Sequence, residues 1–342
     1  MIGSKLCMRK LVLVFFVVVL LPLIILGADK LPAEKAGKIT SPQGQIAFIR
    51  NGNVWAMDAD GKNQDMKCEV ANADGRLSWS PDGKKIAFTR SGMVDLKGPD
   101  PVVGGKHKVY DIFVAWLDSA YANNRMWWTR LTDNLGSKSP EWSADGNTII
   151  FCNDMNANIV NALEPNYQIC TMGPEGENYQ ILRKDWQNFS DDFLISPTLS
   201  PNGKIAAVTI NNRRPIGFAL FDKDNFMVPI DTIRSRAGKN SKLVAPSWSP
   251  DGQWLAYINN SINNSGVYIT SPDLSEHYLV FSPPVGTYLY TVSPSFSPDS
   301  KWLTFSTTDG SVWICDITGN GARRLTGPGL DKFPAWSKGT PK

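Results

Sequence analysis

The chain has 342 residues, of which 42% are hydrophobic and 20% are charged, and this composition excludes a disordered or fibrous protein. Its formal net charge is +3, with 35 basic and 32 acidic residues. Lys5, Arg9 and Lys10 are the charged residues before position 29, so the rest of the chain has 32 basic and 32 acidic residues. A neutral domain lacks the basic balance of a nucleic-acid-binding domain, and that function is excluded.

Residues 1–28 have the features of an export signal. A basic start is followed by the apolar run Leu11 to Leu26, which has 16 residues, and then by Gly27 and Ala28. This pattern predicts a cleaved signal peptide, because a spanning helix needs about 20 apolar residues; an uncleaved anchor is the alternative. We therefore expect a periplasmic or secreted protein, with a linker at 29–40 and one domain at 41–342.

A turn motif recurs along the rest of the chain. It is complete in Trp79-Ser-Pro-Asp-Gly83 and Trp248-Ser-Pro-Asp-Gly252, and degenerate around Trp142, Leu199 and Phe296. Pro presets φ, Asp suits the next position, and Gly accepts the positive φ that follows. The residues taken to define the repeat are Trp79, Pro81, Asp82, Gly83, Trp142, Trp248, Pro250, Asp251, Gly252 and Trp336.

The spacing of these copies predicts a closed ring of four-stranded units. Successive copies, ending with the truncated one at Trp336, are 63, 57, 49, 48 and 40 residues apart, which fits propeller blades with loop insertions. The region from 45 to 68 supplies three strands without a preceding turn motif. We therefore predict an all-β, six-bladed propeller in which one blade combines strands from both ends of the chain. The recurring tryptophans, with Trp55 and Trp313 on third strands, are expected to pack between blades.

These repeats resemble the WD40-like PD40 repeats of the TolB-type propellers, over roughly residues 40 to 340. The resemblance implies a six-bladed propeller in the cell envelope or outside the cell. Proteins of the TolB type carry an α/β domain before the propeller and bind a lipoprotein partner. Here only about a dozen residues separate the predicted signal from the first strand, so we expect that domain to be missing.

The connections predict where a partner binds. Turns between first and second strands are short and repetitive, whereas the second-to-third and blade-to-blade connections are long and varied. Rigid scaffolds commonly carry function on such loops, although long loops are also tolerated as neutral insertions. Within them, charged and aromatic residues suit recognition of a protein or peptide, unless they pack locally. The predicted partner-binding residues are Lys106, His107, Trp186, Asp191, Asp192, Tyr288 and Tyr290.

The residue inventory favours a binder over an enzyme. The two histidines, His107 and His277, cannot build a multi-histidine metal centre, and no G-x-S-x-G motif is present. We therefore predict no catalytic residue, no metal and no cofactor, with a calcium site at Asp191 and Asp192 as the alternative. The competing function is a carbohydrate-binding or carbohydrate-cleaving propeller, because two acids across a channel could still form a catalytic pair. We expect a monomer that contacts membrane only through an uncleaved N-terminal segment.

The cysteines leave two alternatives. Cys68, Cys152, Cys170 and Cys315 lack the spacing of a zinc site. Cys152 and Cys170 lie on strands that should pair in one blade, and an oxidising compartment would allow a disulfide between them. Buried free thiols are the other possibility.

Overall fold

The computed structural model describes ten stretches of the chain. They are residues 29–96, 105–117, 128–159, 165–182, 193–211, 214–222, 231–234, 243–260, 265–290 and 294–338. The predicted signal at 1–28 lies outside them. Among the described residues, no helix has the length and apolar character needed to cross a membrane.

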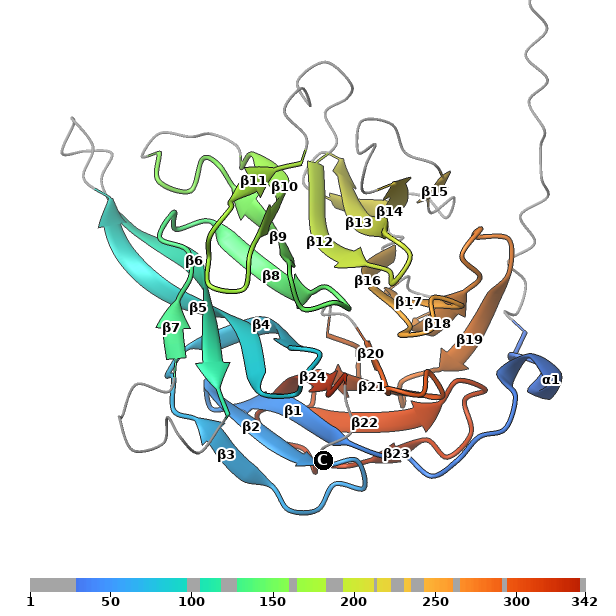
Figure 1. Cartoon of the computed structure of the whole chain (residues 1–342). Helices are drawn as coiled ribbons and strands as arrows, with labels where there is room; N and C mark the ends of the chain where they lie inside the picture. Colours follow the sequence, from blue (N-terminus) through green and yellow to red (C-terminus); the bar gives the residue numbers. More distant parts are fainter. Residues whose placement is uncertain are drawn as a thin grey trace, which may run out of the picture.

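Six antiparallel four-stranded sheets surround a common axis, which confirms the predicted six-bladed propeller (Figure 1). Blade 1 contains β24 (Asp331–Trp336), β1 (Gln45–Arg50), β2 (Asn53–Asp58) and β3 (Asp65–Cys68). Blade 2 contains β4 (Ala73–Trp79), β5 (Lys85–Leu96), β6 (Gly105–Trp116) and β7 (Trp128–Arg130). Blade 3 contains β8 (Ser137–Trp142), β9 (Ile149–Asp154), β10 (Tyr167–Met172) and β11 (Gln180–Ile181).

The other three blades follow the same order from the axis outwards. Blade 4 contains β12 (Phe193–Leu199), β13 (Lys204–Asn211), β14 (Arg214–Asp222) and β15 (Asp231–Arg234). Blade 5 contains β16 (Leu243–Trp248), β17 (Leu255–Asn259), β18 (Gly266–Thr270) and β19 (His277–Phe281). Blade 6 contains β20 (Ser295–Phe296), β21 (Trp302–Thr307), β22 (Ser311–Asp316) and β23 (Arg323–Arg324). The first strand of each blade lies nearest the axis and contacts the first strands of its neighbours (Figure 1).

Blade 1 joins the two ends of the chain, as the truncated repeats predict. β24 pairs with β1 in antiparallel register, with Ile46 opposite Trp336. At the far end of this pair, Arg50 Nε and Nη2 each donate to a carboxylate oxygen of Asp331 at 2.6 Å. This pairing closes the ring and leaves β1 and β24 paired with each other instead of exposed as free strand edges.

The repeated motif forms the turn that its residues predict. In the first copy, Ser80 Oγ donates to Asp82 Oδ1 at 2.6 Å and accepts from Lys85 N at 2.9 Å. Gly83 has a φ of +69°, a conformation that glycine adopts without the strain of a Cβ. At the copy without glycine, Ser300 takes a φ of +60°, and its hydroxyl accepts from Asp251 N at 3.1 Å. The same turn therefore forms in the degenerate repeat.

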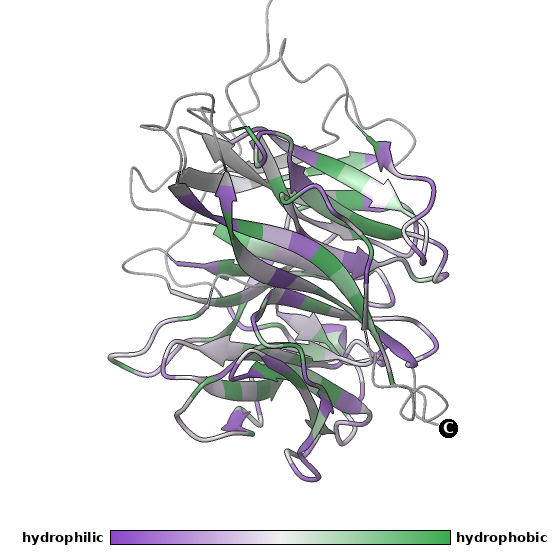
Figure 2. Ribbon diagram, turned by 90° about the vertical axis from the view of Figure 1, so that its left-hand side faces the viewer, coloured by the Kyte–Doolittle hydropathy of each residue, from purple (hydrophilic) through white to green (hydrophobic). Residues whose placement is uncertain are grey.

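The apolar core lies between adjacent blades, and hydrophobic positions concentrate along the strands (Figure 2). The motif tryptophans Trp79, Trp142 and Trp336 are each 2% exposed, which confirms their predicted core role. The expectation for Trp55 and Trp313 is only partly correct, because both remain partly exposed. Arg50 and Arg324 cover these two rings, at 4.9 Å and 5.0 Å from the ring centroids.

The segment predicted as a linker at 29–40 packs against blades 5 and 6. It contains the short helix α1 (Ala33–Ala36). Leu31 and Ala36 are 4% and 1% exposed and belong to the same apolar cluster as Val280 and Ile317. Leu279 N donates to Asp29 O at 3.0 Å, which extends the pairing of β19 beyond the blade. This segment is therefore part of the packed domain.

Candidate functional site

The ring has two unlike ends. The turn face is defined by the first-to-second-strand turns of each blade, such as 80–84 and 249–253. The loop face, at the other end, is defined by the second-to-third-strand and blade-to-blade connections. A channel wall made of the six inner strands joins the two faces (Figure 1).

The inner strands bend where they line the channel. β-bulges interrupt the pairing of β4, β8, β12, β16 and β24, each next to a residue of positive φ. A bulge re-aims the backbone, so carbonyl groups that would otherwise serve the sheet can face the axis. Those residues of positive φ are Gly75, Ser139, Ser196, Ala245 and Phe333.

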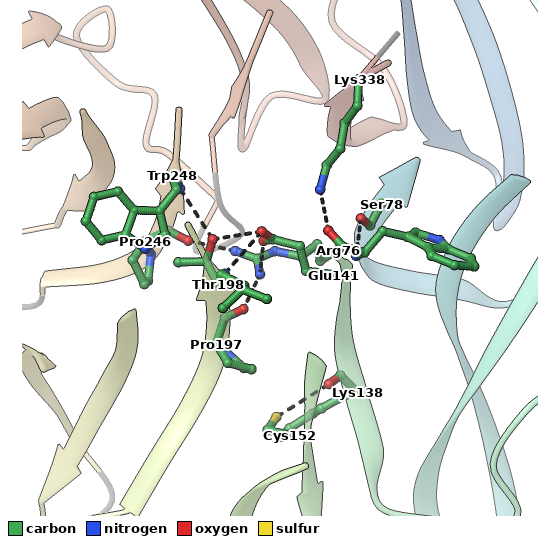
Figure 3. A network of polar contacts seen from close by, with 12 residues as sticks. Arg76, Ser78, Lys138, Glu141, Cys152, Pro197, Thr198, Pro246, Trp248 and Lys338 are labelled. Atoms are coloured by element: carbon green, nitrogen blue, oxygen red, sulfur yellow. Dashed lines mark hydrogen bonds and ion pairs between the residues drawn. The ribbon is translucent and has the colours of Figure 1, made fainter. Parts of the chain in front are cut away.

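A buried polar network crosses the channel at this level (Figure 3). Arg76 Nη1 donates to Glu141 Oε2 at 2.9 Å and to Pro197 O at 2.6 Å, and Nη2 donates to Pro246 O at 2.7 Å. The other oxygen of Glu141 accepts from Thr198 Oγ1 at 2.9 Å. Burial lowers the pKa of Arg76, and the charge of Glu141 opposes that effect. One guanidinium thus links the inner strands of blades 2, 3, 4 and 5.

Hydroxyl groups connect the inner strands nearer the turn face. Each lies one residue before the apolar residue that starts the turn motif, and accepts from the main-chain N–H of the motif tryptophan in the following blade. Ser78 Oγ accepts from Trp142 N at 3.0 Å, and Thr198 Oγ1 accepts from Trp248 N at 3.3 Å. Ser295 Oγ accepts from Trp336 N at 2.9 Å. The inner strand is the edge strand of its blade, so these main-chain N–H groups have no neighbouring strand to donate to. The hydroxyls accept their hydrogen bonds instead.

The loop face carries part of the predicted partner-binding set. Lys106 and His107 are exposed on β6, opposite Asp95 and Val94 of β5. Their neighbour Lys108 forms an ion pair within the domain, because its Nζ lies 2.9 Å from Asp74 Oδ2. This hydrogen bond raises the pKa of Lys108. The β5–β6 hairpin therefore presents Lys106 and His107 to solvent.

The two predicted tyrosines differ. Tyr288 is 66% exposed and is free to contact a partner. Tyr290 is partly buried and packs edge-on against Phe333, with ring centroids 5.3 Å apart, so it has the local packing role. Trp186, Asp191 and Asp192 lie outside the described residues, and so does the alternative calcium site. The described part of the chain holds no group of three or more His, Cys, Asp or Glu side chains that could hold a metal ion.

The sequence did not predict that large hydrophobic side chains would be exposed on the loop face. Five of the seven large hydrophobic side chains that are exposed among the described residues belong to this face. Tyr288 and Leu330 lie on segments that meet the β21–β22 turn, through Thr308 N to Tyr288 O at 2.8 Å and Gly329 N to Asp309 O at 2.9 Å. The five residues are Met93, Ile159, Val285, Tyr288 and Leu330. Their one signal in the sequence is the presence of large apolar residues within long connections.

The four described cysteines, Cys68, Cys152, Cys170 and Cys315, are buried free thiols, so the disulfide alternative is wrong. The strands of Cys152 and Cys170 do pair, but Cys152 lies opposite Ile169 and Cys170 opposite Phe151. An offset of one residue places the two side chains on opposite faces of the sheet. Burial raises the pKa of Cys170 to about 12, so this thiol stays protonated at neutral pH.

Comparison with known proteins supports the fold. No family model and no curated protein matches the chain. It is similar to the crystal structure of TolB from Acinetobacter baumannii, with a TM-score of 0.62 and 19% identity over 86% of this chain and 66% of that one. A TolB candidate from Agrobacterium tumefaciens gives 0.57 and 14% identity over 87% and 92%.

A chain of the crystal structure of a nidogen/laminin complex gives a TM-score of 0.57 and 10% identity over 86% of this chain and 98% of that one. At such identities the similarity concerns the fold. The chain spans 66% of the length of the Acinetobacter TolB. The fold is that of a TolB-like six-bladed β-propeller.

Proposed function

We propose that this protein is an exported, non-catalytic propeller that binds a protein or peptide partner in the cell envelope through its loop face. The observation that carries the proposal is the gathering of exposed large hydrophobic side chains on that face. Val285 is fully exposed, and Tyr288 and Leu330 are 66% and 67% exposed. Apolar groups that remain in water at one end of a molecule are typical of an interaction site.

Charge beside the apolar residues supports the same reading. Lys332 follows Leu330 by two residues, and Lys332 and Lys108 share the single carboxylate of Asp74, at 3.7 Å and 2.9 Å. The exposed Lys106 and His107 project from the neighbouring β5–β6 hairpin. Exposed apolar side chains with basic neighbours suit a partner segment that combines apolar and acidic side chains.

Two further observations support the proposal. The similarity to TolB and to a chain of a nidogen/laminin complex is in keeping with a propeller that meets another protein. The Glu141 carboxylate in the channel is held by Arg76 and Thr198, which favours a structural role for it over acid–base work.

The test is quantitative capture of partners from envelope extract by the mature protein and by the double variant Tyr288→Ala/Leu330→Ala. Because exposed anchors of an interface carry much of its energy, the double variant should recover its partner about tenfold less well. Met66→Ala is the matched control, since Met66 is an exposed apolar residue, at 40%, on the outer strand β3. Equal capture by the double variant, or equal loss in the control, would overturn the proposal.

Carbohydrate is the competing ligand class. Oligosaccharides that bind the native state raise its apparent thermal stability. If oligosaccharides raise the apparent thermal stability saturably, and the double variant abolishes that rise, the loop face binds a carbohydrate and the proposal of a protein partner is wrong.

A further inference from the structure

A cavity of about 160 Å³ opens at the turn-face end of the channel. Prolines and aromatic residues of the repeated turns form its apolar rim. Arg76, Glu141 and Lys338 are its charged lining residues, and Ser78, Ser247 and Ser295 contribute hydroxyls. An apolar rim around a few convergent polar groups is the usual composition of a small-ligand site. Its volume accommodates several water-sized groups.

The charges around this cavity are unbalanced. Arg76 and Glu141 neutralise each other through their contact of 2.9 Å. Lys338 reaches the same space from just beyond β24, and its Nζ donates to the carbonyl of Trp142 (Figure 3). Among the described residues, no carboxylate lies within ion-pair distance of Lys338. With Lys338 protonated, the described lining residues therefore carry one net positive charge.

Donors remain available beside that charge. An ammonium group has three N–H donors, and the contacts of the described residues use one of those of Lys338, on Trp142 O. The hydroxyls of Ser78 and Ser295 accept from main-chain N–H groups, so each keeps its own hydrogen for a second bond. Ser78 and Lys338 both contact the main chain of Trp142, which places their polar atoms close together.

A partly buried ammonium without a counter-charge in contact is unfavourable. Burial lowers the pKa of Lys338, the charge of Arg76 lowers it further, and Glu141 opposes both effects. An anion that enters the cavity would supply the missing negative charge, and the apolar rim would strengthen the attraction by excluding water.

We propose that this cavity binds a carboxylate group, held by the ammonium of Lys338 and the hydroxyls of Ser78 and Ser295. A single net positive charge matches a carboxylate better than a doubly charged phosphate. The carboxylate can belong to the C-terminus of a peptide or to an acidic side chain. This site lies at the opposite end of the ring from the loop face and does not depend on the function proposed for that face.

The test is calorimetric titration of the mature protein with three peptides. They are acetyl-Ala-Ala-Ala with a free C-terminal carboxylate, the same peptide with a C-terminal amide, and acetyl-Ala-Glu-Ala amide. The first and third separate the two sources of the carboxylate. We expect saturable binding of at least one of them, and binding of the neutral amide at least about tenfold weaker, because hydrogen bonds to charged groups contribute more than neutral ones.

Variants assign the binding to the cavity. Lys338→Met should weaken carboxylate binding by about tenfold to a hundredfold, and Lys338→Arg should retain most of it. Lys84→Met removes an exposed charge from the turn face outside the cavity and should leave the affinity unchanged. Thermal unfolding of each variant verifies that the fold is intact.

Three outcomes would overturn the proposal. They are equal affinity for the carboxylate and amide peptides, an unchanged affinity in Lys338→Met, and the absence of saturation at millimolar concentrations of both acidic peptides. A loss of affinity in Lys84→Met equal to that in Lys338→Met would indicate general attraction to the turn face and would overturn it as well.

Discussion

Arg76 and Glu141 form an ion pair of 2.9 Å in the channel wall, with their side chains 7% and 12% exposed. The pair joins β4 to β8, and the same guanidinium reaches the carbonyls of Pro197 on β12 and Pro246 on β16. Four inner strands therefore depend on one charged group, and Glu141 supplies a negative charge in direct contact with it.

Glu141→Gln tests this dependence. The amide keeps the size of the side chain but removes the negative charge that contacts the buried Arg76 at 2.9 Å, so the free energy of unfolding should fall by about 3 kcal/mol. Urea denaturation measures it. Asp60→Asn removes an exposed carboxylate beside Lys62 and serves as the control, for which no change is expected. The double variant Arg76→Leu/Glu141→Leu should cost less than the two single changes together, because it removes both members of the ion pair at once. An additive loss would contradict the coupling.

His277 should make the stability depend on pH. Burial lowers its pKa, against smaller opposite effects of its bond to Leu274 and of the nearby charge of Asp273. The Leu274 carbonyl lies 3.0 Å from Nε2 and the Tyr257 hydroxyl lies 3.2 Å from Nδ1, the partners of a neutral ring that donates through Nε2. The contribution of the neutral ring is therefore full above the unfolded-state pKa of about 6.5 and is lost as the pH falls toward the lower folded-state pKa.

Thermal unfolding between pH 7.5 and pH 5 measures this effect. His277→Gln should flatten the profile over that interval, whereas His107→Gln, at an exposed position, should leave it unchanged. Asp273, whose pKa is lowered to about 2 by hydrogen bonds from Ser271 and Ser275, stays ionised throughout. A profile that His277→Gln leaves intact would show that another group titrates.

Leu31 tests whether the segment before the first strand is part of the domain. Its side chain is 4% exposed against blades 5 and 6, so Leu31→Ala should lower the free energy of unfolding by about 2 kcal/mol or more through lost burial and the cavity left behind. Leu330→Ala, at a position that is 67% exposed, is the matched control and should change stability little. Equal stabilities of the two variants would mean that the segment contributes nothing.

The repeat allowed the blades and their closure to be predicted because their chemistry is local. Both complete Ser-Pro-Asp-Gly copies form the turn that their residues favour, and the tryptophan before each packs between blades. The two incomplete units, 45–68 and the copy at Trp336, complement each other in strand count, so their pairing followed without knowledge of distances.

The repeat pattern did not allow us to predict the direction in which individual side chains point. Cys152 and Cys170 do lie on paired strands, but the register that sets their faces depends on the length and shape of a connection. Tyr288 and Tyr290 are two residues apart in one loop, and packing against Phe333 buries part of one ring while the other stays exposed.

By itself the sequence determined the six-bladed ring, its turns and the aromatic core, since each rests on contacts within a repeat or between repeats in fixed order. Only the tertiary structure decided which residues meet at the axis. Arg76 and Pro246 are 170 residues apart, and Lys338 and Trp142 are 196 apart. Ring closure brings them together, because it sets the distance between blades regardless of their separation along the chain.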